Sequence, residues 1–267
     1  MKKATPVSFE FLYQVFSLIL ITIILHALYV GIIRPRGDAV LTEQEAVMKT
    51  DKTAVSQRSV YVVIRDYEQE ACFILMFWAM ALMAFKGIRT TRDQSLLQQD
   101  LIPVAEDMRI LPEDTRQLSR HIQALPDSRR NALLPRALLA GLQRFSATGS
   151  VQDVASAIQA YCTAEGERLD SELSMIRYIA WAIPSIGFIG TVRGIGEALG
   201  QAHKAIEGEI FGVTRSLGVA FNSTLIALLL SIVLMFLLHQ LQLRQERYVL
   251  DAEAYCEEKL TRHLRPA

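Results

Sequence analysis

Two hydroxyl side chains, those of Thr191 and Thr224, are the residues of this sequence whose type and position fit chemistry inside a membrane. Each lies near the middle of a long apolar stretch, the first over residues 175–199 and the second over residues 212–238. A hydroxyl donates and accepts hydrogen bonds, but it does not titrate near neutral pH. The pair could therefore hold water or a carboxylic acid on a proton path, but it could not store the proton itself.

Small or polar residues accompany both threonines, most of them at a spacing of three or four that places them on one face of a helix. Small faces let membrane helices pack closely, and with hydroxyls they can also line a polar seam or pore. Both interpretations stay open for these positions. They are Pro184, Gly187, Gly190 and Gly194 in residues 175–199, and Ala220, Asn222, Ser223, Ala227 and Ser231 in residues 212–238.

Pro184 lies well inside the apolar stretch of residues 175–199. A proline inside a helix removes one backbone hydrogen bond and costs about 3 kcal/mol in water. In a membrane it is tolerated where neighbouring groups satisfy the freed carbonyl. We therefore expect a bend or hinge at this position.

The composition indicates which elements position these residues. Of 267 residues, 51% are hydrophobic and 21% are charged, which is too apolar for an ordinary soluble domain and too charged for a chain buried wholly in lipid. A further apolar run, residues 9–33, is long enough to cross a hydrocarbon core of ~30 Å at about 1.5 Å per residue, and the apolar residues 71–88 are predicted to form another span. The sequence thus predicts an all-α integral membrane protein with four transmembrane helices, whose long helices extend into a cytoplasmic helical region.

The predicted organisation alternates between membrane and water. Basic residues follow the second span at Lys86 and Arg89, which by the positive-inside rule favours both termini in the cytoplasm, although Arg34 and Arg36 oppose this orientation. Residues 1–33 form an N-terminal tail and the first transmembrane helix, 34–70 a small periplasmic loop, 71–88 the second transmembrane helix, 89–174 a cytoplasmic helical region, 175–238 a core with the third and fourth transmembrane helices, and 239–267 a cytoplasmic C-terminal helix.

The first span could instead be a signal peptide. We expect it to be retained, because it is longer than a signal core and lacks a small-x-small cleavage site. His26 lies within it, and a lone histidine on an apolar helix is more often packed or near the headgroups than part of a proton relay. The first two spans carry no polar seam, so we expect them on the lipid side.

Several classes of function are disfavoured by what the sequence lacks. It contains no G-x-x-x-x-G-K-[ST], no H-E-x-x-H and no C-x-x-C, and its three cysteines show no metal spacing. A net charge of +0 disfavours a general nucleic-acid binder. We therefore predict a protein that is not an enzyme, with no cofactor, no metal and three unpaired thiols.

Residues 184–195, PSIGFIGTVRGI, resemble the signature P-x-x-G-x-x-G-T-V-x-G-I in the penultimate membrane helix of the MotA/TolQ/ExbB proton channel family. The last span is similar to the final helix of that family, G-I-A-x-A-L-x-x-T, with Ala220, Phe221 and Thr224 on its A, L and T positions. Val219 and Val233 stand where the family often has an acidic residue and a proline. Within this family, the sequence of the third span, GFIGTVRGI, is more similar to ExbB/TolQ proteins than to MotA proteins.

This resemblance implies a channel subunit that forms a pentameric ring around single-span partners of the MotB/TolR/ExbD type. The partner's membrane aspartate would face the two threonines. The function implied is that of a bacterial inner-membrane, proton-driven motor complex of the ExbB/TolQ kind. A flagellar-stator-like (MotA-like) or specialised stator, and a non-conducting oligomeric scaffold, remain open alternatives.

Overall fold

The computed structural model describes residues 9–50, 59–103, 109–206 and 208–265. Within these ranges the backbone forms helices and short connections without a β-strand, which confirms the all-α prediction. Among the described residues, four helical stretches are long and apolar enough to cross a membrane, as the sequence predicted. They are Phe9–Met48, Tyr67–Gln98, Val151–Gly200 and Phe211–His263.

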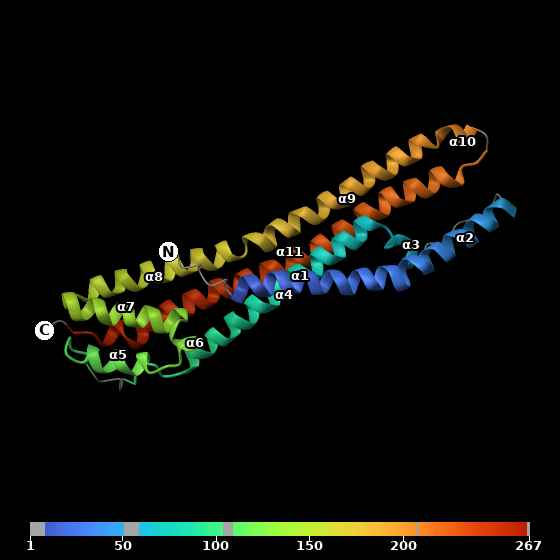
Figure 1. Cartoon of the computed structure of the whole chain (residues 1–267). Coiled ribbons are helices and arrows are strands. Elements are labelled where there is room, and N and C mark those ends of the chain that lie inside the picture. The colour runs from blue at the N-terminus through green and yellow to red at the C-terminus, as the bar shows by residue number, and fades with distance from the viewer. Residues whose placement is uncertain (1–8, 51–58, 104–108, 207, 266–267) are drawn as a thin grey trace, which may run out of the picture. The chain divides into compact units, whose positions relative to one another are not determined.

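The chain folds into two compact units. The membrane unit comprises Met1–Met83 and Met175–Leu238, and the helical unit comprises Ala84–Ser174 and His239–Ala267. Three helices contribute residues to both units. They are α4 (Tyr67–Gln94), α9 (Ser174–Gly200) and α11 (Phe211–Lys259), drawn in Figure 1.

The first helical stretch of the membrane unit is longer than predicted. Helix α1 (Phe9–Leu28) passes through a π-helical turn at Tyr29–Ile33 directly into α2 (Arg34–Thr50), as Figure 1 shows. Residues 34–50, which the sequence placed in a loop, are therefore helical. Further along the chain, residues Val60–Val63 form the short helix α3.

Arg34 explains why the helix continues where the sequence suggested a loop. Its guanidinium pairs with Glu70 and lies over the ring of Tyr67, 4.1 Å from the ring centroid. These contacts with α4 hold the start of α2. The π-helical turn ends two residues before Pro35, which cannot donate a backbone hydrogen bond to the preceding turn.

In the membrane unit, α1 packs on α4 and α9 packs on α11. Helix α1 contacts α4 through the hydroxyl of Tyr13, which donates to the carbonyl of Ala81, and through Trp78, whose indole donates to the carbonyl of Gln14. Helix α10 (Ala202–Ile206) lies in the link between α9 and α11. Consecutive contacts between α9 and α11 run in opposite sequence directions, so the two helices are antiparallel neighbours (Figure 1).

The helical unit has its own apolar core. Helices α7 (Leu133–Thr148) and α8 (Val151–Glu172) pack against each other and against the last part of α11. Phe145, Ile158 and Tyr248 are among the side chains buried there. Short elements complete the unit, namely η2 (Ser95–Gln98), α5 (Thr115–Gln123), α6 (Asp127–Arg130) and η3 (Thr261–His263).

Helix α8 begins at a serine cap and leads almost directly into α9. Ser150 caps α8, because its hydroxyl accepts a hydrogen bond from the backbone N–H of Asp153 at 3.2 Å. Only Leu173 separates the end of α8 from the start of α9, and α11 runs unbroken beyond the fourth apolar stretch. Cys72 of the membrane unit and the other two cysteines, Cys162 and Cys256, are free and buried.

Candidate functional site

The small faces predicted on the third and fourth spans face each other. A methyl group added at Gly190 would lie 2.5 Å from the Cβ of Ser223, and one at Gly194 would lie 2.7 Å from the backbone N of Ala220. Such distances leave no room for a side chain, so glycine is required for this approach of the two backbones. Gly187 is packed in the same way against Ala227.

Thr191 and Thr224 meet in this closely packed region. Their hydroxyl oxygens are hydrogen-bonded to each other across the helix pair. The Thr191 hydroxyl also lies 3.1 Å from the carbonyl oxygen of Ala220, and the Thr224 hydroxyl lies 3.2 Å from the carbonyl oxygen of Gly187. The two hydroxyls therefore face each other across the helix pair.

The hydroxyl pair can be hydrogen-bonded in two directions. Each hydroxyl has one hydrogen, so the pair can make only two donations at a time. In one arrangement Thr191 donates to Thr224, which donates to the carbonyl of Gly187. In the other, Thr224 donates to Thr191, which donates to the carbonyl of Ala220. The direction can thus reverse by rotation of two hydroxyl groups, without movement of the helices.

Pro184 and Ser231 are linked through one carbonyl group. Proline has no N–H, so the carbonyl oxygen of Ala180, four residues earlier in α9, lacks its usual helical donor. The hydroxyl of Ser231 in α11 donates to this oxygen at 3.0 Å. A neighbouring helix therefore satisfies the carbonyl that the proline frees.

Asn222 lies beside the hydroxyl pair in sequence but faces another region of the membrane unit. It lines a pocket of about 290 Å³ between the first turns of α11 and the segments α2 and α3. Arg65, Asp66 and Arg215 also line this pocket. The structure thus brings Ser223 into the glycine-packed contact and places Asn222 apart from it.

The first turn of α4 contributes polar contacts that the sequence did not predict. Glu68 accepts two hydrogen bonds from Arg193 of α9, at 2.6 and 2.9 Å. Glu70 is 5% exposed and accepts hydrogen bonds from His26, at 2.7 Å, and from Arg34. Glu68 and Glu70 therefore join α4 to three other helical segments, namely α9, α1 and α2.

The intervening residue, Gln69, contacts the last helix of the membrane unit. It is 1% exposed, and its side-chain nitrogen lies 3.4 Å from the hydroxyl oxygen of Ser223. Three consecutive residues of α4 therefore join it to α1 and α2, to α9 and to α11. No sequence spacing could have revealed this, since Gln69 and Ser223 are 154 residues apart.

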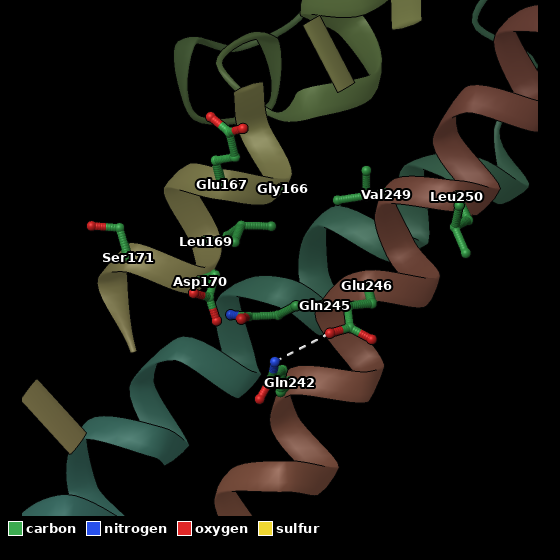
Figure 2. Close-up of a pocket in the computed structure, with 10 residues that line it drawn as sticks. All are labelled: Gly166, Glu167, Leu169, Asp170, Ser171, Gln242, Gln245, Glu246, Val249 and Leu250. Atoms are coloured by element: carbon green, nitrogen blue, oxygen red, sulfur yellow. Dashed lines mark hydrogen bonds between the residues drawn. The ribbon is translucent and has the colours of Figure 1, made fainter. Parts of the chain in front are cut away.

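The helical unit contains a larger pocket, of about 590 Å³, between α8 and α11 (Figure 2). Leu169, Val249 and Leu250 provide its apolar lining, and the amide of Gln242 donates to Glu246 at 3.2 Å along its edge. Neither this pocket nor any other part of the described chain groups three metal-ligating side chains. The hydroxyl pair in the membrane unit is therefore the stronger candidate site.

The comparisons with known proteins agree with this assignment. Residues 129–254 match the model of the MotA/TolQ/ExbB proton channel family. No curated protein and no solved structure gives a significant match to the chain. The matched region includes both threonines, all of α9 and most of α11, whereas α1, α2 and α4 lie outside it. The region that carries both threonines is therefore similar to the MotA/TolQ/ExbB proton channel family.

Proposed function

We propose that this chain is the channel subunit of a bacterial inner-membrane complex of the ExbB/TolQ kind, which couples proton flow to work on the cell envelope or to transport. The observation that carries the proposal is the reversible hydroxyl pair formed by Thr191 and Thr224. Both residues lie within the region that matches a proton channel family. The hydroxyl pair adds two polar groups to a contact that is otherwise packed by glycine and alanine.

The proton carrier in this proposal is a carboxylic acid from a partner subunit. Thr191 and Thr224 do not titrate near neutral pH, and Glu197, the acidic residue of the third apolar stretch, lies near its end. A single-span subunit of the MotB/TolR/ExbD type would supply an aspartate. When ionised, this aspartate would accept the hydrogen that one hydroxyl otherwise donates to a backbone carbonyl. When protonated, it would donate its own hydrogen to a hydroxyl oxygen.

We further propose that several copies form a ring, with the family's pentamer as the expected state. Large apolar side chains point away from the fold on both helices of the site, including Phe188, which is 65% exposed, and Phe221, which is 68% exposed. Lipid, neighbouring copies and the partner span would cover these surfaces. The helical unit and both termini would lie in the cytoplasm, as the basic residues after the second span indicate.

Two alternatives make different predictions. A non-conducting scaffold is supported by the glycine-packed contact between α9 and α11, which needs no transported ion. A flagellar-stator-like complex is supported by four spans with a large segment between the second and the third. A scaffold would not conduct protons, whereas a flagellar-stator-like complex would. A flagellar-stator-like complex and an ExbB/TolQ-like complex would differ in the periplasmic part of the partner subunit.

The proposal is tested by purifying the complex from native membranes through an affinity tag on this chain. We expect a single-span subunit with a membrane aspartate to copurify. After reconstitution into liposomes, a potassium diffusion potential should drive proton uptake, measured with an enclosed pH-sensitive dye. Replacing the partner's aspartate with asparagine should abolish the uptake. A purified oligomer of this chain alone, with no proton uptake above that of empty liposomes, would instead establish the scaffold.

A further inference from the structure

Gln69 has a buried acceptor that no donor in the described part of the chain occupies. Its side-chain nitrogen donates to the carbonyl of Val63 at 3.1 Å and lies 3.4 Å from the hydroxyl oxygen of Ser223. The Val63 carbonyl and the Ser223 hydroxyl both accept from Nε2, so they define which end of the amide is the nitrogen. The side-chain oxygen, Oε1, is enclosed and makes no hydrogen bond to any described residue.

The surroundings of Gln69 show that the missing donor must come from outside these contacts. Ser223 donates its single hydroxyl hydrogen to the carbonyl of Val219 at 2.8 Å, so it can accept from Gln69 but has no hydrogen for Oε1. The carboxylates on either side, Glu68 and Glu70, have no hydrogen to donate when ionised and are held by positively charged side chains. Burying an acceptor without a donor destabilises a fold, so its presence calls for an explanation.

The location of Gln69 connects it with the hydroxyl pair. Ser223 immediately precedes Thr224 in α11, and it packs against Gly190, which immediately precedes Thr191 in α9. The amide of Gln69 therefore borders the same contact between α9 and α11 that holds the threonines. An amide oxygen accepts strong hydrogen bonds but is not protonated near neutral pH, so it can stabilise a passing proton donor without trapping the proton.

We propose that Gln69 is a further residue of the proton path, and that its Oε1 accepts a hydrogen bond from proton-bearing water between the hydroxyl pair and the first turn of α4. This inference rests on the proposed channel function. It assigns a direct role in conduction to the second span, which lies outside the region matched by the family model.

The test compares two buried glutamines in the reconstituted complex described above. Gln69→Met keeps the length of the side chain and removes the amide. Gln245→Met is the matched control, because Gln245 is also buried, its nitrogen lies 3.5 Å from the hydroxyl of Thr90, and its Oε1 also lacks a donor among the described residues. It belongs to the helical unit. We expect Gln69→Met to lower proton uptake by about fivefold or more, and Gln245→Met to leave it within about twofold of the unchanged protein.

A third variant separates a role in the path from a role in packing. Gln69→Glu carries an acceptor carbonyl and a donor hydroxyl when protonated, but loses the donor when ionised. Relative to the unchanged complex, its proton uptake should recover at acidic pH and fall at alkaline pH, whereas that of Gln69→Met should stay low throughout. Equal uptake by Gln69→Met and the unchanged complex, an equal loss in both methionine variants, or a Gln69→Glu profile without pH dependence would overturn the inference. Absence of uptake in the unchanged complex would instead refute the channel function.

Discussion

The hydroxyl of Ser231 donates a hydrogen bond to the carbonyl oxygen of Ala180, the oxygen that Pro184 leaves without a helical donor. The contact joins α11 to α9 at the one point where a proline interrupts the hydrogen bonding of α9. Ser231 therefore has a structural role that differs from that of the two threonines. The polar face of α11 serves both to hold the helix pair together and to form the candidate proton site.

Pro184 and Ser231 should be energetically coupled. Ser231→Ala removes the donor to the Ala180 carbonyl and should lower the free energy of unfolding by about 0.5 to 1.5 kcal/mol. In the Pro184→Ala background the new backbone N–H can serve that carbonyl, so Ser231→Ala should have a smaller effect. Unfolding measured in mild detergent for the four proteins of this double-mutant cycle gives the coupling energy directly. Equal effects of Ser231→Ala in both backgrounds would show that the two residues act independently.

The glycines between α9 and α11 should differ sharply from a glycine that faces outward. Gly194→Ala would place a methyl group against the backbone of Ala220, so we expect destabilisation by about 1 to 3 kcal/mol and weaker assembly. Gly196→Ala is the matched control, because no atom lies within 4 Å of the added methyl group. It should be neutral or slightly stabilising, since alanine favours a helix more than glycine does. Thermal unfolding in detergent compares the two, and similar losses in both would contradict the packing described.

The antiparallel packing of α9 against α11 could be predicted, because the sequence features that indicate it lie within the two helices and the short link between them. Small residues at a spacing of three and four define one face of each helix, and two consecutive spans joined by a short link must be antiparallel neighbours. The relation between Thr191 and Thr224 followed from their depth in the two spans. The role of Ser231 did not, since recognising it requires knowing which carbonyl of α9 lies opposite.

The role of α4 and the length of the first helix could not be predicted, because they depend on contacts between distant residues. Pro35 and the surrounding charges favour a loop locally, yet the pairing of Arg34 with Glu70 keeps the segment helical. The second span was expected to face lipid because its sequence lacks a polar seam. The contacts that join it to α9, α11 and the start of α2 come from Glu68, Gln69 and Glu70, which precede the apolar run.

The ion pair between Glu68 and Arg193 should contribute to the packing of α4 on α9. Glu68 is largely buried and the pair is bidentate, so a double-mutant cycle with Glu68→Gln and Arg193→Gln should give a coupling energy of about 1 kcal/mol. Arg193 also pairs with Glu197, one turn further along α9 and largely exposed. The corresponding cycle with Glu197→Gln is the control and should give about 0.3 kcal/mol. A larger coupling to Glu197 than to Glu68 would contradict this assignment.

The most direct test of the channel site is proton uptake by the reconstituted complex that carries Thr191→Val together with Thr224→Val. Valine keeps the shape of threonine and removes the hydroxyl. The partner's acid would then lack its hydrogen-bonding group, so we expect uptake to fall by about tenfold or more while the partner still copurifies. The double serine variant, Thr191→Ser with Thr224→Ser, retains both hydroxyls and should conduct. Ser231→Ala, which removes a hydroxyl from the same face of α11, should lower uptake less. Undiminished uptake by the double valine variant would contradict a role for these residues in the proton path.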